Sequence, residues 1–346
     1  MKKIFVHIGG HKTGSTAIQE HLKINKKNLT SKGYFYYDTY ESNTFSKLIN
    51  SKNIKIKKLI IKNIIKEIEK NKYKNIILSR GSLSGNILNK YNDAKTFAVL
   101  LNEFKKKGYD IKIIYFVRDP VPFLLSTFFQ LKKNKKFTNI NFNKYINDFK
   151  PELFFLKTIN GYKHYFKNKI LIKNYSRVYK NDQQFINFFS KLINIKFPIK
   201  MINKKINISY NKDLQYISNI LDKETNNFER KKILKILNFI HRVISKTSNN
   251  NHKETNIYVD YDKINLIKNF QKNKIFTKLN KKYNTQLKQN YIIKPIIPNN
   301  FIGFIFSIIL ILTNFIYIKK INKEKIKKII NLVMHEGFLK KILNYF

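Results

Sequence analysis

A short loop near the start of the chain carries residues suited to holding a phosphate-like anion. An apolar stretch, residues 4–8, runs into Gly9 and Gly10 and then into His-Lys-Thr-Gly-Ser-Thr. Glycines let the backbone come close to a ligand, and the amides that open the following helix point their N–H groups at it. A lysine adds a full positive charge. The residues that we expect to bind the anion are Gly10, Lys12, Thr13, Gly14, Ser15 and Thr16.

The spacing of this loop separates it from two common nucleotide-binding motifs. Gly9 and Gly14 have the spacing of the G-x-x-x-x-G-K-[ST] loop, but Ser15 stands where that loop has its lysine. The dinucleotide motif G-x-G-x-x-G is excluded because position 11 is His11. Taken alone, the loop could also be an ordinary glycine turn between a strand and a helix, with Lys12 in solvent.

A second pattern of anion-binding residues follows another apolar stretch, residues 111–116. Arg118 and Asp119 come next, and Ser126 lies in the helix expected over residues 121–131. A guanidinium group binds a phosphate through two parallel hydrogen bonds, and a hydroxyl group can complete the contact. The chain has only five arginines, so an arginine at this point suggests a need for its fork. The alternative is a helix-capping Asp119 with an incidental arginine beside it.

The order of apolar stretches predicts how these residues are positioned. Strands are expected over 4–8, 34–37, 75–78, 111–116 and 170–173, and helices over 16–29, 58–71 and 94–107. Alternating strands and helices predict an α/β fold of three layers, in which helices flank a central parallel sheet. Ligands bind such sheets at the carboxyl ends of the strands. Both anion-binding patterns fall at such ends.

The two patterns together resemble the sulfotransferases that use 3′-phosphoadenosine 5′-phosphosulfate (PAPS), in particular bacterial members with an HKTG[ST]T loop. The similarity covers about residues 3–285. It implies a P-loop-like fold and transfer of a sulfuryl group from PAPS to a hydroxyl or amine, without a metal. It also implies that Lys12 and residues 13–16 bind the 5′-phosphosulfate, with Lys12 stabilising the leaving group, and that Arg118 and Ser126 hold the 3′-phosphate.

The acceptor side departs from this family. Many relatives have a carboxylate in an S-x-E pattern after the third strand, whereas this chain reads Ser-Arg-Gly-Ser at 79–82. A histidine that many carry after the second strand is absent here. A general base should deprotonate the acceptor, and His11 and Asp38 are the candidates. His7, inside the first strand, is expected in the core.

Two other functions stay open on the sequence. One is a P-loop kinase or nucleoside triphosphatase, although the chain lacks a lysine after Gly14 and offers only Asp119 as a magnesium ligand at a strand end. The other is a sulfotransferase-like binding protein that has lost its acceptor base. The missing carboxylate near Gly81 favours it.

Composition limits the partners. The chain has no cysteine, which excludes disulfides and thiolate metal sites, and no Asp/His cluster has metal-ligand spacing. Its 346 residues carry a formal charge of +48, which ordinarily suggests nucleic acid or an anionic membrane. Because the lysines are scattered along the whole chain, we expect no specific nucleic-acid partner. The charge favours polyanionic partners, and we expect a glycan or glycolipid acceptor.

The end of the chain differs from the rest. We expect an α/β domain over 1–285 and a hydrophobic, amphipathic tail over 286–346. Residues 301–318 carry no charge, a length at the short edge of a transmembrane helix. A buried helix is the alternative. The first apolar run is too short for a signal peptide, so we expect a cytoplasmic protein associated with the inner membrane through this tail.

Overall fold

The computed structural model describes residues 1–132, 140–179, 181–195, 256–259, 263–289 and 291–295. The chain forms two compact units. The first contains Met1–Ile206 and Asn269–Asn290, and the second contains Asn207–Lys268 and Tyr291–Phe346. The uncharged segment 301–318 lies outside the described residues, so the expected tail and its boundary stay predictions.

The first unit is built on a sheet of five parallel strands in the order β2-β3-β1-β4-β5. The strands are β1 (Lys3–His7), β2 (Tyr34–Tyr37), β3 (Asn75–Ser79), β4 (Asp110–Val117) and β5 (Ile170–Asn174). Each was expected from its apolar run. Because β1 lies between β3 and β4, the loops after these three strands meet at one edge of the sheet. The expected α/β class is confirmed.

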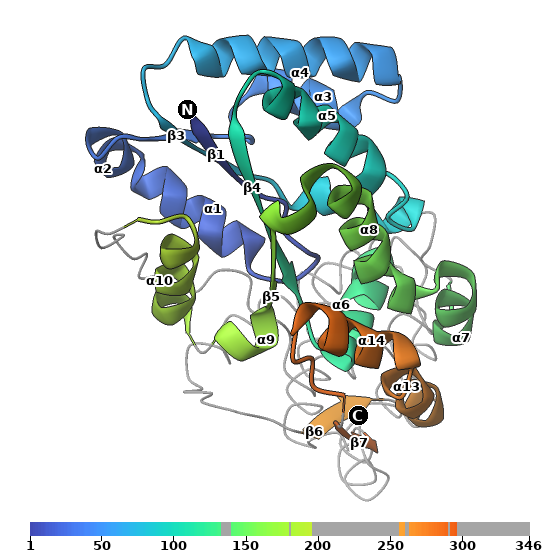
Figure 1. The fold of residues 1–346 in the computed structure, drawn as a ribbon. Helices are drawn as coiled ribbons and strands as arrows, with labels where there is room; N and C mark the ends of the chain where they lie inside the picture. Colours follow the sequence, from blue (N-terminus) through green and yellow to red (C-terminus); the bar gives the residue numbers. More distant parts are fainter. Residues whose placement is uncertain (133–139, 180, 196–255, 260–262, 290, 296–346) are drawn as a thin grey trace, which may run out of the picture. The chain divides into compact units, whose positions relative to one another are not determined.

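Helices cover both faces of this sheet (Figure 1). The helices of the first unit include α1 (Ser15–Ile24), α2 (Lys26–Ser31), α3 (Asn43–Asn50), α4 (Ile54–Glu69), α5 (Ala94–Lys106), α6 (Pro120–Lys132), α7 (Phe142–Lys144), α8 (Phe154–Phe166), α9 (Tyr175–Val178), α10 (Asp182–Leu192) and α14 (Lys274–Tyr283). Figure 1 shows α1 and α10 on one face and α5 and α8 on the other. This three-layer arrangement buries each face of the parallel sheet.

Alternate residues of the strands divide between the two faces. On one face, Phe5, Ile77 and Phe116 pack in a buried cluster with Ile18 of α1 and Phe189 of α10. On the other, the ring of Tyr115 in β4 meets Phe155 of α8 edge-on, with ring centroids 6.5 Å apart. Strands buried on both faces need continuous apolar runs. These runs are the reason that the strands could be predicted from the sequence.

One expected element differs. The helix expected over 16–29 is interrupted at Asn25, where α1 gives way to α2. The side-chain amide of Asn25 donates to the carbonyl of His21 at 2.8 Å, and Asn side chains that bond nearby backbone compete with regular helix. The apolar spacing continued through this break because Leu29 of α2 is also buried in the core.

In the second unit, β6 (Asn256–Val259) and β7 (Ile292–Pro295) form a two-stranded parallel sheet. Helix α13 spans Ile264–Gln271. In the described part of the chain, none of the helices combines the length and apolar character needed to cross a bilayer.

Candidate functional site

The loop after β1 has the backbone of an anion cradle. Gly9, Lys12 and Gly14 have φ values of 70°, 59° and 74°, in the left-handed region. Gly14 is the N-cap of α1, and its carbonyl accepts from the Ile18 amide at 3.1 Å. The first amides of α1 therefore point into the loop, where the helix dipole favours negative charge.

Two glycines are required by close packing. A Cβ atom on Gly9 would lie 2.6 Å from the Cα of Gly81, in the segment after β3. A Cβ atom on Gly10 would lie 2.4 Å from the carbonyl oxygen of Phe116 in β4. The loop is thus pressed against both neighbouring strands, and a side chain at either position would displace backbone.

The hydroxyl groups of the loop have different surroundings. Thr13 is buried and donates to the Gly10 carbonyl at 2.9 Å, which closes the loop on itself. The Oγ of Ser15 is buried without a hydrogen-bond partner among the described residues. Lys12 and Thr16 are exposed. An unpaired buried hydroxyl costs free energy, and an anion in the loop would supply the missing acceptor.

The structure brings the two anion-binding patterns together. β1 and β4 are paired, and Arg118 directly follows β4. Its Nη1 donates to the carbonyl of Lys12 at 3.2 Å, across 106 positions of sequence. The guanidinium group therefore lies beside the loop, as the expected two-part anion site requires.

Ser126 lies on α6, where its hydroxyl donates to the carbonyl of Phe123 at 2.9 Å. A phosphate dianion can only accept hydrogen bonds. The Ser126 hydroxyl could therefore bind a phosphate only after breaking its bond to the Phe123 carbonyl. The structure thus places Ser126 on the expected helix with its proton directed at its own backbone. Its role toward a 3′-phosphate stays a prediction.

His11 contacts a residue that the sequence did not single out. Its Nδ1 is hydrogen-bonded to the hydroxyl of Tyr91. Burial, with a contribution from the charge of Lys12, lowers the pKa of His11 to about 4. Burial also raises the pKa of Tyr91 well above its ordinary value. The ring of His11 is therefore neutral and the phenol protonated at neutral pH.

The hydroxyl of Tyr91 decides which nitrogen of His11 carries the proton. Tyr91 is buried, and the only hydrogen bond of its hydroxyl in the described chain is to His11. A buried O–H group needs an acceptor, so the phenol donates to Nδ1 and the ring proton lies on Nε2. In this form Nε2 is a donor, whereas a general base needs a lone pair there. The base role expected for His11 would require the other tautomer.

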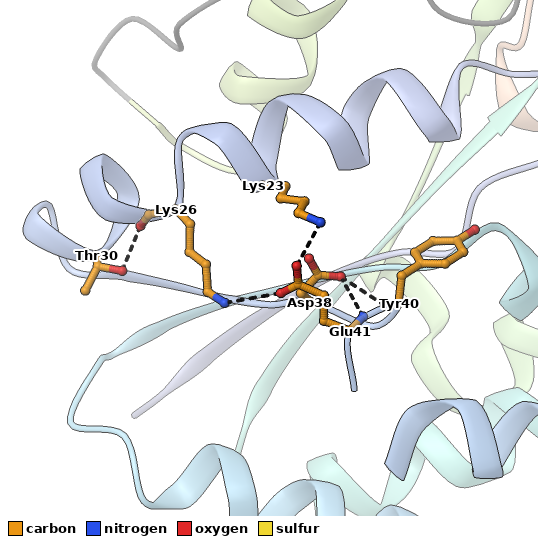
Figure 2. A network of polar contacts seen from close by, with 6 residues as sticks. All are labelled: Lys23, Lys26, Thr30, Asp38, Tyr40 and Glu41. Atoms are coloured by element: carbon orange, nitrogen blue, oxygen red, sulfur yellow. Dashed lines mark hydrogen bonds and ion pairs between the residues drawn. The ribbon is translucent and has the colours of Figure 1, made fainter. Parts of the chain in front are cut away.

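Asp38 caps a turn. Its Oδ1 accepts from the amides of Tyr40 at 3.0 Å and Glu41 at 3.3 Å, just after β2 (Figure 2). Glu41 in turn pairs with Lys23 at 2.8 Å and Lys26 at 3.8 Å. In the sheet, β3 stands between β2 and β1. The hydrogen bonds of Asp38 thus hold the turn, and its role as a base stays a prediction.

His7 and Asp119 are both bonded to neighbouring elements of the fold. His7 is fully buried, as expected, and its Nδ1 contacts the Ser79 Oγ at 2.8 Å. Burial lowers the pKa of His7 to about 3. The Oδ1 of Asp119 accepts from the Asn174 side chain at 2.9 Å and from the Lys288 amide at 3.0 Å. Among the described residues, no group of three or more metal-ligating side chains gathers.

Sequence reasoning missed the position of Arg80. Its guanidinium carbon lies 3.7 Å from the centre of the Tyr40 ring, and its Nη1 donates to the Thr39 carbonyl at 3.3 Å. From the sequence alone, this segment is distinguished only by the missing carboxylate. The scarcity of arginine, together with the position directly after a strand, is the signal that pointed to Arg118 and would also have found Arg80.

The chain has little similarity to known proteins. No protein-family model matches the chain, and no curated protein matches it. Among solved structures, it is similar to the crystal structure of a sulfotransferase from Alicyclobacillus acidocaldarius. The TM-score is 0.38 and the identity 10%, over 60% of this chain and 87% of that chain. This is a partial likeness of folds, and neither family nor activity follows from it.

Proposed function

We propose that this protein is a sulfotransferase that moves a sulfuryl group from PAPS to a hydroxyl or amine of a glycan or lipid-linked saccharide. The observation that carries the proposal is the hydrogen bond from Arg118 to the carbonyl of Lys12. It joins a glycine loop at a helix N-terminus to a guanidinium group from the next strand. A nucleotide with phosphates at both its 5′ and 3′ positions needs two such anion sites.

The residues present fit the 5′ end of this donor. The glycine backbone leaves no room for side chains, the Ser15 hydroxyl lacks a partner among the described residues, and Lys12 is exposed beside them. The donor supplies an activated sulfuryl group. Lys12 and the α1 amides would neutralise negative charge that develops on the leaving phosphate, which is the main contribution a protein makes to such transfers.

Arg118 would hold the 3′-phosphate, with Ser126 completing the contact after release of the Phe123 carbonyl. Arg118 also positions the loop, because its other partner is the Lys12 backbone. His11 and Asp38 are the proposed bases. In the tautomer inferred from the Tyr91 contact, the Nε2 of His11 would instead donate a hydrogen bond to an oxyanion.

We also propose that residues 301–318 associate with a membrane, which would bring the protein to a lipid-linked acceptor. The full-length chain should fractionate with membranes and resist extraction by salt. A chain that ends at Asn290 should lose this association. If the shortened chain instead fails to bind donor nucleotide, the segment belongs to the core.

A catalytically impaired binding protein is the second candidate. The engagement of Asp38 Oδ1 in a turn and of His11 Nδ1 with Tyr91 favours it, because each candidate base already uses one of its acceptor atoms to hold local structure. A kinase or triphosphatase is less favoured. Ser15 replaces its lysine, and Asp119 is bonded to Asn174 and Lys288.

Two measurements test the proposal. Calorimetry should show tighter binding of adenosine 3′,5′-bisphosphate than of ATP, and a preference for ATP would contradict the donor assignment. Transfer from radiolabelled PAPS to cell-envelope saccharides then separates an enzyme from a binding protein. Donor binding without any transfer would favour the binding protein.

A further inference from the structure

Arg80 lies beside the glycine loop, on the side opposite Arg118. It directly follows β3, and its amide donates to the carbonyl of His7 at the end of β1 at 3.0 Å. The next residue, Gly81, is the one that a Cβ atom on Gly9 would meet at 2.6 Å. The backbone of Arg80 is therefore fixed against the base of the loop.

The side chain of Arg80 is held by uncharged groups. Nη1 donates to the Thr39 carbonyl at 3.3 Å, Nε donates to the Ser82 Oγ at 3.4 Å, and the guanidinium group stacks on Tyr40 at 3.7 Å. Nη2 has no hydrogen bond in the described chain, and no carboxylate there pairs with Arg80. The result is a preorganised fork whose charge is not neutralised. Such a fork binds an oxyanion with little loss of entropy.

The acidic residues nearest in sequence are bonded elsewhere. Asp38 caps the turn through the amides of Tyr40 and Glu41, and Glu41 pairs with two lysines of the α1–α2 segment. Figure 2 shows the ring of Tyr40 extending away from both carboxylates. Among the described residues, these two carboxylates therefore do not pair with Arg80, although they lie close to Tyr40 in the sequence.

The strand order decides which ligand this fork faces. β3 and β4 lie on opposite sides of β1, so Arg80 and Arg118 flank the loop. This step rests on the proposed function: donor phosphates occupy the loop and the Arg118 side. The leaving phosphate then lies in the loop and the 3′-phosphate on the Arg118 side, which leaves the Arg80 side of the loop for the acceptor.

We propose that Arg80 binds a carboxylate on the acceptor, and hence that the acceptor is an acidic saccharide. Tyr40 holds the fork, and 58% of this residue is exposed, which leaves aromatic surface for the apolar face of a sugar ring. Arg80 touches the acceptor away from the reacting atoms, so it determines specificity.

The test uses the full-length chain saturated with adenosine 3′,5′-bisphosphate and two matched probes, a tetramer of galacturonate and the corresponding tetramer of galactose. The wild-type protein should bind the acidic probe about 10-fold or more tightly than the neutral one, as expected of a charge-assisted bidentate contact. Arg80→Gln should abolish most of this preference. Arg80→Lys, which keeps the charge but loses the fork, should retain only part of it.

Lys62→Gln is the matched control, because Lys62 is exposed on α4 and its loss removes the same charge. This variant should keep the wild-type preference. If Arg80→Gln and Lys62→Gln behave alike, or if the wild-type protein shows no preference, the inference is overturned.

Donor binding separates this inference from the proposed function. Arg80→Gln should bind adenosine 3′,5′-bisphosphate as the wild-type protein does, and an equal loss of donor affinity would assign Arg80 to the donor and overturn the inference. If the wild-type protein binds no bisphosphate, the proposed function fails. The preference for galacturonate, measured without nucleotide, then still decides whether Arg80 recognises a carboxylate.

Discussion

Arg118 and Arg80 occupy equivalent positions, each directly after a strand that borders β1, yet their guanidinium groups are held differently. Arg118 bonds the Lys12 carbonyl and so belongs to the glycine loop itself. Arg80 stacks on Tyr40 and bonds Thr39, in the segment after β2. The difference shows that a position directly after a strand places an arginine at the carboxyl edge of the sheet. The segment after the neighbouring strand then determines which groups the guanidinium contacts. Substitutions in the loop or at Arg118 should therefore impair donor binding or transfer, whereas Arg80→Gln should leave donor binding unchanged.

The largest effect is expected from Lys12→Ala. Lys12 is exposed, so its loss should leave the fold intact, whereas transfer should slow by about 10²- to 10³-fold, the usual effect of losing one preorganised donor at the transition state. Single-turnover transfer from PAPS measures the rate, and circular dichroism checks the fold. Wild-type turnover in this variant would show that the loop does not face the reacting group.

The second prediction concerns the contact between β1 and β3 that supports the Arg80 side. The pKa of His7 is about 3 in the folded protein, against 6.5 ordinarily, because burial disfavours the charged ring. Below pH 6.5 the unfolded chain therefore binds a proton that the folded protein does not. The free energy of unfolding should fall by roughly 3 kcal/mol from this group between pH 7 and pH 4.

Urea unfolding across this pH range measures the effect, and His7→Leu should show a shallower decline because it removes the titrating group. An identical decline in the variant would mean that His7 is not the group responsible. The pKa of His11, lowered to about 4, acts in the same direction and should leave a smaller residual slope in His7→Leu.

Arg118→Ala tests the other side of the loop. It should weaken adenosine 3′,5′-bisphosphate by about 10- to 100-fold, since a bidentate charged contact is lost. Adenosine 5′-phosphosulfate, which has no 3′-phosphate, should be affected much less. Calorimetry with both nucleotides decides, with Arg80→Gln as the control that changes neither. Equal losses for the two nucleotides would remove the 3′-phosphate from Arg118.

The smallest effect is expected from Tyr91→Phe. The phenol of Tyr91 donates to Nδ1 of His11 and so stabilises the neutral ring. Without it, the pKa of His11 should rise from about 4 toward its ordinary 6.5, by roughly one unit, as for loss of a hydrogen bond to the neutral form. Nitrogen-15 NMR of the imidazole measures both the pKa and the tautomer. An unchanged titration, or a proton on Nδ1 in the wild-type protein, would refute the assignment.

Much of the fold was predictable because its signals are local. The central strands β1, β3 and β4 are largely buried and so appear as apolar runs, and the glycines at 9, 10 and 14 mark the loop directly. The error at Asn25 arose because apolar spacing reports which side faces the core and does not show where the helix is interrupted. Arg118 was predictable because an arginine after a strand is informative in a chain that has few.

The sequence by itself determined an α/β chain with a glycine loop after its first strand and an arginine after its fourth, since local spacing and residue type suffice for these. Only the tertiary structure decided that Arg118 bonds Lys12, that Tyr91 holds His11, that Asp38 caps a turn and that Arg80 stacks on Tyr40. Most of these contacts join residues far apart in the sequence, up to 106 positions for Arg118 and Lys12. The contact of Asp38 is local, but several groups could have bonded its carboxylate. The order of the strands brings them together, and that order is set by the packing of both sheet faces, which no single segment encodes.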